Sequence, residues 1–339
     1  MSEQEKTDER YMQRCIEIAR NGLQTAKPNP AVGAVIVSAD GRIIGEGYTS
    51  AFGGPHAEVN AFASVKEEDE KLLHDATIYV SLEPCSHWGK TPPCCDLIIR
   101  KGVKRVVCGC VDPFAKVQGR GIRKIREAGT DVTVGVLEAE CIESNKRFFT
   151  FNEQRRPYII LKWAQSWDRF IDDNGKPAMF STPYTQMLAH KMRAENDAIL
   201  VGKTTFLRDN PQLTVREWTG NNPLRIVLTK DKEFENKFRK EHSDNWECFE
   251  SIYNALDYLY EKGKQSLIVE GGAATLKSFA EAGLWDEIRV ETSPKIVRGG
   301  TSAPAIPANA VAIAHEEYDG NIIITYERKD KKYGKANRQ

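Results

Sequence analysis

The sequence predicts an α/β protein built from two successive domains. Three observations support this: the chain has 339 residues, short apolar runs alternate with helical patterns in both halves, and a polar segment ending in Pro157 separates the halves. A domain usually holds about 150 residues, so each half is long enough to bury its own core. We therefore expect a first domain over residues 1–150 and a second over residues 156–339, joined by the segment FNEQRRP.

The first half contains a hairpin signature followed by alternating helices and strands. Residues 31–48 form an apolar run, an Asp-Gly turn and a second apolar run, which is typical of a β-hairpin. Before them, helical spacing predicts a helix capped by Asp8 and stopped by Gly22. After them, the pattern predicts helices over 56–66, 94–102, 121–129 and one ending at 149, and strands over 76–82, 105–111 and 131–136. This alternation favours a three-layer α/β/α domain with helices on both faces of one sheet.

The second half repeats the alternation with its own set of elements. Apolar runs predict strands over 158–166, 197–202, 223–229, 266–272, 286–295 and 321–329. Between them, helical patterns cover 184–194, 251–263 and 274–283. Clear turn signals separate these runs. The second half is therefore expected to fold independently as another α/β domain.

Charge and cysteine content narrow the classes of function. Lys plus Arg and Asp plus Glu both total 48, so the net charge is zero and no basic field is available to attract nucleic acid or anionic membranes. The polar start MSEQEKTDER and the absence of a long apolar stretch predict a cytoplasmic protein with no membrane span. Five of the eight cysteines lie between Cys85 and Cys110, which in such a protein favours metal binding or catalysis over disulfides.

The most informative residues form a pattern expected of catalytic zinc. His56 and Glu58 stand where the chain leaves a Gly-Gly-Pro turn and enters a predicted helix, Cys85 follows a predicted strand, and Cys94 begins another helix. One imidazole and two thiolates would leave the fourth tetrahedral position of zinc to water. Helix N-termini pointing at the ion would favour the thiolate form. Glu58 is then free to act as the proton carrier in hydrolytic deamination.

The spacing of the two cysteines departs from the usual zinc-deaminase signature. That signature closes with P-C-x-x-C, whereas eight residues separate Cys85 from Cys94 here. Two alternatives therefore stay open: Cys95 could replace Cys94 as the ligand, or the residues could form a structural zinc knot. The intervening loop carries His87 and Lys90, side chains suited to a polar, phosphorylated substrate. The remaining cysteines fall on apolar faces and are interpreted as core residues: Cys15, Cys108, Cys110, Cys141 and Cys248.

The segments HAE, EPCSHWGKTPPC and KPNPAVGAV together resemble the deaminase half of the bifunctional riboflavin-biosynthesis deaminase/reductase family. In that family the long loop after EPC is normal, so the eight residues between Cys85 and Cys94 support the resemblance. The resemblance implies a cytidine-deaminase-like fold, a pyrimidine contact for Asn29, and pocket positions for His87 and Lys90. The alternative for Asn29 is a plain turn between Pro28 and Pro30.

Spacing alone says less about the second half. Residues 269–273 run from a strand through a Gly pair into a helix, a geometry that lets backbone N–H groups approach a phosphate, although a tight turn is an equally good interpretation. The G-x-G-x-x-G fingerprint is absent, and VGKTT lacks the Gly that a phosphate-binding loop needs where Asp197 stands.

Resemblance to the reductase half of the same family adds the missing assignments. It rests on LKWAQSWD, RAENDAILVGKTTFLRDNPQLTVR and IVEGGAATL, and it implies a dihydrofolate-reductase-like fold. Residues implied to bind NADPH are Ala164, Thr205, Asp209, Gly272, Ala273, Ala274, Thr275 and Leu276. Those implied to face the substrate are Arg193, Leu213, Arg216 and Glu270; without the resemblance, the two arginines would be interpreted as surface residues. Paired N–H donors of arginine suit a phosphate.

Two short segments depart from the family pattern. The family usually has S-x-D-G where Arg169 follows Asp168, and Trp-Ile-Thr where this chain has Met179, Phe180 and Ser181. An Arg at a glycine position either blocks a left-handed backbone or marks a turn that is built differently. Asp168 itself is interpreted either as a functional residue or as a turn residue.

The resulting hypothesis is a two-step enzyme of riboflavin biosynthesis that uses one zinc ion and NADPH. The first domain is expected to deaminate 2,5-diamino-6-ribosylamino-4(3H)-pyrimidinone 5′-phosphate, and the second to reduce the ribosyl chain to ribityl, giving 5-amino-6-ribitylamino-uracil 5′-phosphate. Its partners are expected to be these small phosphorylated pyrimidines and further copies of itself, forming a homo-oligomer, with no nucleic acid or membrane. The rivals are a nucleoside or tRNA deaminase with an accessory domain and a zinc-stabilised binding module without activity.

Overall fold

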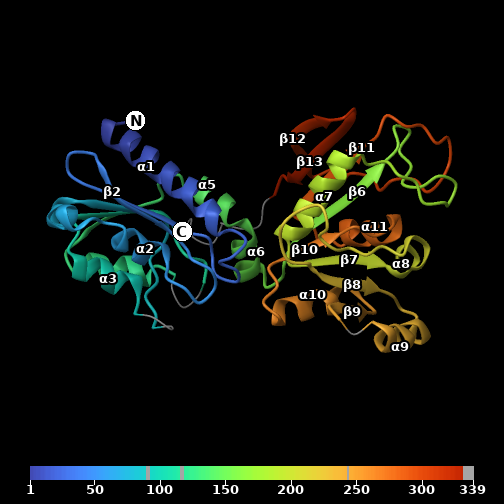
Figure 1. Cartoon of the computed structure of the whole chain (residues 1–339), viewed down its shortest axis with the longest axis horizontal. Helices are drawn as coiled ribbons and strands as arrows, with labels where there is room; N and C mark the ends of the chain where they lie inside the picture. Colours follow the sequence, from blue (N-terminus) through green and yellow to red (C-terminus); the bar gives the residue numbers. More distant parts are fainter. Residues whose placement is uncertain (89–91, 115–117, 243, 331–339) are drawn as a thin grey trace. The chain divides into compact units, whose positions relative to one another are not determined.

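The computed structural model describes residues 1–88, 92–114, 118–242 and 244–330 (Figure 1). Within them the chain divides into two compact units between Gln154 and Arg155. This division falls inside the expected linker 151–157, whose first four residues instead complete helix α6 (Lys146–Gln154). None of the helices in these ranges has the length and apolar character needed to cross a membrane.

A five-stranded sheet forms the centre of the first unit, in the order β2-β1-β3-β4-β5. β1 pairs antiparallel with β2 and β3, whereas β3, β4 and β5 run parallel to one another. The expected hairpin is confirmed, with Gly33 opposite Tyr48. β1 is buried along its whole length, as its unbroken apolar sequence requires. The strands span β1 (Gly33–Val37), β2 (Ile43–Tyr48), β3 (Thr77–Leu82), β4 (Arg105–Cys110) and β5 (Asp131–Val134).

Helices cover both faces of this sheet, which confirms the predicted three layers. α1 and α5 contact each other and the central strands, while α2, α3 and α4 contact one another in series and pack on the strands as a second group (Figure 1). The helices are α1 (Glu3–Ala19), α2 (Ala57–Ala63), α3 (Cys94–Lys101), α4 (Arg120–Glu127) and α5 (Glu138–Ser144), with 3₁₀ turns at Arg20–Gly22 and Glu67–Asp75.

The expected cap of the first helix is wrong. α1 begins five residues earlier than Asp8, and Ser2 caps it through a capping box with Glu5. Asp8 is buried inside the helix, where its carboxylate accepts hydrogen bonds from the guanidinium of Arg105 on β4. The short polar side chain therefore serves a buried ion pair instead of a helix end.

An eight-stranded sheet organises the second unit, in the order β12-β13-β11-β6-β10-β7-β8-β9. The strands from β11 to β9 are parallel, and the antiparallel hairpin β12-β13 extends one edge. The strands are β6 (Tyr158–Gln165), β7 (Ala198–Gly202), β8 (Leu224–Leu228), β9 (Trp246–Phe249), β10 (Ser266–Val269), β11 (Glu287–Thr292), β12 (Ala310–Tyr318) and β13 (Asn321–Arg328). β9 and β12 were not predicted.

In the described part of this unit five helices accompany the sheet: α7 (Pro183–Glu195), α8 (Lys203–Asp209), α9 (Lys232–Glu241), α10 (Ile252–Glu261) and α11 (Ala273–Glu281). α8 and α9 were not predicted, since each buries only one phenylalanine, Phe206 and Phe238. The core joins apolar side chains of the central strands to Phe279 and Trp285. The predicted class of two α/β domains is confirmed.

Candidate active sites of the two units

Three side chains from separate segments meet in the first unit. His56 is the N-cap of α2, Cys85 follows β3, and Cys94 is the first residue of α3. The Nδ1 nitrogen of His56 lies 3.6 Å from Sγ of Cys85 and 3.5 Å from Sγ of Cys94. The three ligand atoms lie within 4.8 Å of one another.

These separations match a tetrahedral zinc site. Zinc–sulfur bonds of about 2.3 Å and zinc–nitrogen bonds of about 2.0 Å hold a sulfur and a nitrogen ligand about 3.6 Å apart. One imidazole and two thiols also form the donor set that zinc prefers. Three protein ligands leave one tetrahedral position for a small molecule, so His56, Cys85 and Cys94 fit a catalytic zinc ion.

The polar surroundings favour a thiolate at Cys85. Its Sγ accepts a hydrogen bond from the backbone N–H of Cys94 at 3.3 Å. A hydrogen bond from the Cys94 thiol, with a further contribution from His56, lowers the pKa of Cys85 to about 4. The thiol of Cys95 instead contacts the carboxylate of Asp96, 3.5 Å away. The structure thus brings Cys94, and not Cys95, to the other two ligands.

Glu58 is the second residue of α2 and lies in its first turn, two positions after the ligand His56. It is only 4% exposed, and burial together with the charge of Cys85 raises its pKa to about 7. A carboxylic acid whose pKa lies near neutrality can both take up and release a proton under ordinary conditions.

Glu83, two residues before Cys85, was not recognised from the sequence. Its buried carboxylate accepts hydrogen bonds from the backbone N–H groups of Gly119 at 2.7 Å and Gly121 at 3.0 Å, and also from Asp112 and Ile122. A Cβ atom at Gly121 would lie 2.0 Å from the carbonyl oxygen of Pro84. Glu83 thus fixes the strand end that carries Cys85 against the start of α4. The sequence signal that could have identified Glu83 is an acidic residue directly before the Pro-Cys pair.

In the second unit, a cavity of about 530 Å³ opens at the carboxyl ends of the parallel strands β7, β8 and β10. Thr205 and the turn Gly272–Thr275 line it. The hydroxyl of Thr205 accepts a hydrogen bond from the N–H of Gly272 at 2.9 Å. α11 has no side-chain cap at its start, so its first N–H groups are available to a phosphate. A cleft at the carboxyl ends of parallel strands is the usual place for a dinucleotide.

A buried ion pair lies near the end of β10. Arg193 of α7 donates a hydrogen bond to Glu270 at 2.8 Å, and Nζ of Lys162 on β6 lies 4.0 Å from the other carboxylate oxygen. Oε1 of Glu270 and Nε of Arg193 are buried, without a hydrogen-bond partner among the described residues. The ammonium and guanidinium groups hold the pKa of Glu270 below its usual range despite burial. This arrangement leaves polar atoms available to a substrate.

The other two predicted substrate residues lie beside this pair. Arg193 also donates to the backbone carbonyl of Thr214, and Arg216 donates to the hydroxyl of the same residue at 3.0 Å. Leu213 between them is buried and has a φ of +54°. The four residues that the family resemblance assigns to the substrate are far apart in the sequence and lie close together in the structure: Arg193, Leu213, Arg216 and Glu270.

Comparisons with known proteins assign each unit to a family. The family model described as cytidine and deoxycytidylate deaminase zinc-binding region matches residues 5–110, and the RibD C-terminal domain matches residues 157–312. The riboflavin biosynthesis protein RibD of Aquifex aeolicus is 38% identical over 322 residues, covering 87% of this chain and 89% of that protein. The chain belongs to the RibD family.

Other RibD proteins show the same extent of similarity. RibD of Escherichia coli strain K12 is 36% identical over 330 residues, covering 86% of this chain and 88% of that protein. The crystal structure of a diaminohydroxyphosphoribosylaminopyrimidine deaminase/5-amino-6-(5-phosphoribosylamino)uracil reductase from Thermotoga maritima superposes with a TM-score of 0.85 at 35% identity, covering 96% of this chain and 99% of that one.

Membership of the RibD family establishes the general activity. The chain is a bifunctional deaminase and reductase of riboflavin biosynthesis, and its first unit carries the zinc-binding region of the deaminase model. The expected cytidine-deaminase-like fold of the first unit is confirmed, and the second unit has the fold of the RibD C-terminal domain. The rival of a binding module without activity is therefore wrong.

The other residues of the first unit that the family resemblance assigns to the substrate lie in loops. Asn29 is half-buried in the turn before β1, with its N–H bonded to the carbonyl of Ala26, and it follows the cis peptide bond Lys27–Pro28. The ring of His87 is exposed and contacts Phe114 edge-on, 6.1 Å between ring centres. Lys90 lies outside the described residues. Their substrate contacts stay predictions.

Three of the residues expected at NADPH are not part of the cavity lining described above. Ala164 lies on β6 opposite Glu291 of β11. Leu276 is 1% exposed and belongs to the core. Asp209 ends α8 and pairs with Arg208, which does line the cavity. Their roles toward the cofactor also stay predictions.

Both departures from the RibD pattern have a structural basis. Arg169 takes the left-handed conformation, with a φ of +64°, that the family's glycine adopts without strain. The turn is held by Asp168, whose carboxylate accepts the N–H groups of Val297 and Arg298, so Asp168 is a turn residue. In the second departure, Met179 is 63% exposed and the hydroxyl of Ser181 donates to Glu291 at 2.7 Å.

Proposed function

We propose that the first unit hydrolyses the ring amine of 2,5-diamino-6-ribosylamino-4(3H)-pyrimidinone 5′-phosphate and that the second reduces the deaminated product. The name of the similar Thermotoga maritima enzyme supports these two substrates. The observation that carries the first step is the meeting of His56, Cys85 and Cys94 beside the buried carboxylate of Glu58. In this step the ring carbon loses ammonia and gains the oxygen of water.

The roles in deamination follow from the geometry. His56, Cys85 and Cys94 would hold the zinc ion, which when bound would lower the pKa of a water molecule toward about 7. Glu58, with a pKa near the same value, takes up a proton at its carboxylate and delivers it to the leaving amine. Because the carboxylate is shielded from solvent, the proton stays beside the reacting carbon. Asn29, His87 and Lys90 are proposed to bind the pyrimidine and its phosphate.

Glu58→Gln tests the deamination step. The variant should keep its zinc, because Glu58 is not a ligand, while ammonia release falls by roughly 10² to 10⁴-fold through the loss of proton transfer. Glu127→Gln on the exposed face of α4 is the matched control and should behave as the wild type. Full turnover by the zinc-loaded Glu58 variant would contradict the assignment.

For the reduction, NADPH when bound would supply the hydride for the opened ribose chain. We place its phosphates at Thr205 and the turn from Gly272 to Leu276, with Ala164 and Asp209 as further contacts. The uncapped start of α11 supports this position. The substrate is proposed to lie against Arg193, Leu213, Arg216 and Glu270, with an arginine binding its phosphate.

Gly272→Val tests the cofactor position. A Cβ at residue 272 would lie 3.1 Å from Oγ1 of Thr205, so a branched side chain should crowd both the hydroxyl and the phosphate. NADPH binding, followed by its fluorescence, should weaken at least tenfold while ammonia release by the first unit is unchanged. Unaltered NADPH binding would show that the cofactor lies elsewhere.

The proposal includes a cytoplasmic homo-oligomer. All eight cysteines are unpaired, which supports a reducing compartment. Oligomerisation is supported by β12, the edge strand of the second sheet, which exposes 46% of Val311 and 53% of Ile313. Ile313→Lys should lower the mass measured by light scattering; an unchanged mass would exclude this edge as the interface.

A further inference from the structure

His190 of α7 is a buried histidine whose ring is bonded to the segment that carries two of the proposed substrate residues. It is 4% exposed and lies three positions before Arg193, on the same side of the helix. Its Nδ1 nitrogen accepts hydrogen bonds from the backbone N–H groups of Arg216 at 3.1 Å and of Glu217 at 2.8 Å. The ring therefore joins α7 directly to the backbone of Arg216.

The segment that receives these bonds is held by side chains. Residues 210–223, all within the described part of the chain, connect α8 to β8 outside any helix or strand. Arg193 donates a hydrogen bond to the carbonyl oxygen of Thr214 at 3.4 Å. Oδ1 of Asn222 accepts the N–H of Val215 at 2.7 Å. Because the segment has no ladder or helix of its own, side-chain partners fix its backbone.

The two bonds to His190 also fix the protonation state of its ring. A nitrogen that accepts N–H groups carries no proton, so His190 is neutral with its proton on Nε2. Burial lowers the pKa of His190, and the guanidinium groups of Arg193 and Arg216 lower it further. The carboxylates of Glu217 and Glu270 have smaller effects in the opposite direction. The neutral form therefore predominates at neutral pH.

A proton on Nδ1 of His190 is incompatible with this arrangement. The protonated nitrogen would present its own N–H to the N–H groups of Arg216 and Glu217, so three donors would face one another without an acceptor. Unpaired buried N–H groups are costly, so the segment would have to move away from α7. The two bonds also make Nδ1 unavailable as a proton donor for the reduction.

We infer that His190 is a positioning residue for the reduction: its neutral ring holds Arg216 at the substrate, and protonation of Nδ1 releases it. The inference rests on the proposed substrate position beside Arg193, Leu213, Arg216 and Glu270. Because the side chain of Arg216 is exposed, its placement depends on the backbone that His190 holds. The effect should therefore fall on substrate affinity and leave NADPH binding unchanged.

The test compares His190→Leu with His190→Asn on the full zinc-loaded chain. Leucine removes the acceptor, whereas Oδ1 of asparagine lies close to the place of Nδ1 and does not titrate. The KM for the deaminated pyrimidine, supplied directly, should rise about tenfold in His190→Leu, and His190→Asn should restore most of this loss. NADPH binding and ammonia release by the first unit should stay at the wild-type level in both variants.

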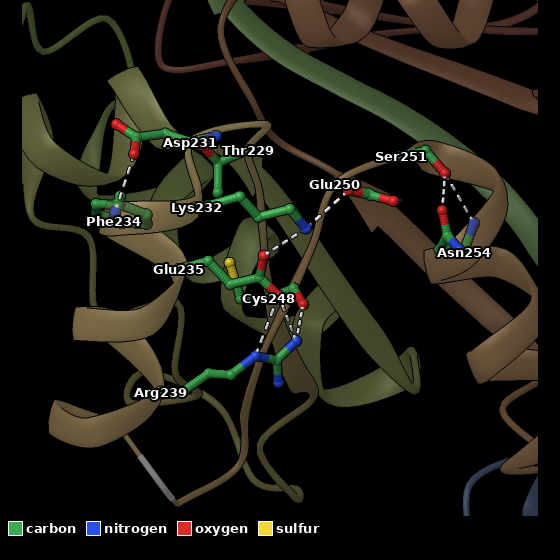
Figure 2. Close-up of polar contacts among 10 residues, drawn as sticks. All are labelled: Thr229, Asp231, Lys232, Phe234, Glu235, Arg239, Cys248, Glu250, Ser251 and Asn254. Atoms are coloured by element: carbon green, nitrogen blue, oxygen red, sulfur yellow. Dashed lines mark hydrogen bonds and ion pairs between the residues drawn. The ribbon is translucent and has the colours of Figure 1, made fainter.

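Ser251→Ala is the matched control, because it also removes a side-chain acceptor of a backbone N–H in the second unit. Oγ of Ser251 accepts the N–H of Asn254 at 3.1 Å at the start of α10, as Figure 2 shows. This variant should lose some unfolding free energy, as loss of a helix cap does, and keep the wild-type KM. An equal rise in KM in Ser251→Ala and His190→Leu would attribute the effect to stability and overturn the inference.

The pH dependence of KM is a second readout, which a purely structural role would not change. As the pH falls from about 8 to about 5.5, the KM of the wild type should rise more steeply than that of His190→Asn, because only the wild type has an acceptor that protonation removes. Titration of the substrate phosphate affects both proteins alike. The same pH dependence in both, or a KM loss in His190→Asn as large as in His190→Leu, would overturn the inference.

Arg216→Met separates a failure of the inference from a failure of the proposed substrate position. If Arg216→Met raises KM while His190→Leu does not, the substrate lies at Arg216 and only the role of His190 is wrong. If neither variant raises KM, the substrate position itself is wrong. Should His190→Leu fail to fold, the pH dependence of the wild type against His190→Asn decides the question.

Discussion

The sulfur of Cys94 lies 3.5 Å from the Nδ1 nitrogen of His56, the distance kept by two ligands of one zinc ion. Its neighbour Cys95 turns to Asp96 on the same helix. Cys94→Ser should therefore reduce bound zinc from about one ion per chain to a small fraction after dialysis. Cys95→Ser should retain the ion. Metal content measured by mass spectrometry distinguishes them, and zinc loss in the Cys95 variant alone would reverse the ligand assignment.

Glu83 is expected to hold Cys85 in place without touching the metal. Glu83→Ala removes the acceptor of buried N–H groups at Gly119 and Gly121, and leaving them unpaired should cost about 3 kcal/mol of unfolding free energy. Urea-induced zinc release reports the unfolding of this unit. Amide hydrogen exchange should rise first at residues 119–122.

The control for this variant is Glu127→Ala at the other end of α4, where the side chain is exposed. It should leave both zinc release and exchange at residues 119–122 close to the wild type. Similar exchange in the Glu83 and Glu127 variants would show that Glu83 does not hold the helix start.

The zinc ligands could be predicted because their chemistry is evident within short segments. A His and a Glu two residues apart, a cysteine after a strand and another at a helix start indicate a metal site before any folding is known. The buried strand β1 could be predicted for a similar reason, since its apolar run is local. The choice between Cys94 and Cys95 was beyond this reasoning, because it depends on which face of α3 packs inward.

The cavity of the second unit could not be predicted from sequence. It depends on the strand order β10-β7-β8, which brings Lys230 to the same cavity as Gly272, 42 positions further along the chain. α9 was missed because its apolar residues are few, with only Phe238 fully buried. β12 was missed because an edge strand faces solvent on much of its length and lacks the pattern of a buried strand.

Asp172 is expected to make the unfolding free energy of the second unit depend on pH in the acidic range. Burial alone would raise its pKa, but hydrogen bonds from Thr301, Gly175 and Arg208 outweigh burial and lower it to about 2. Because the pKa of Asp172 is lower in the folded state, its charge stabilises the fold at pH values above 3.8, its pKa in the unfolded state. This contribution is lost as the pH falls toward 2. Asp172→Asn should therefore cost about 2 kcal/mol at pH 7.

The difference in unfolding free energy between Asp172→Asn and the wild type should be the same at pH 7 and pH 5. It should become smaller below pH about 4. Urea unfolding followed by tryptophan fluorescence is suitable, because all tryptophans except Trp88 lie in the second unit. Asp173→Asn, on the exposed neighbour, should show no such narrowing. A constant difference down to pH 3 would contradict the role of the Asp172 charge.

Arg169 occupies a backbone conformation that costs a non-glycine residue about 1 to 2 kcal/mol. Its φ is +64° and its side chain is exposed, so Arg169→Gly removes the strain without opening a cavity. The variant should raise the unfolding free energy of the second unit by about 1 kcal/mol after the larger entropy loss of glycine is subtracted. Arg169→Ala should give little or none of this gain, since alanine keeps the Cβ atom. Urea unfolding of both variants, followed by tryptophan fluorescence, separates release of strain from loss of the arginine side chain; equal gains in the two would attribute the effect to the side chain.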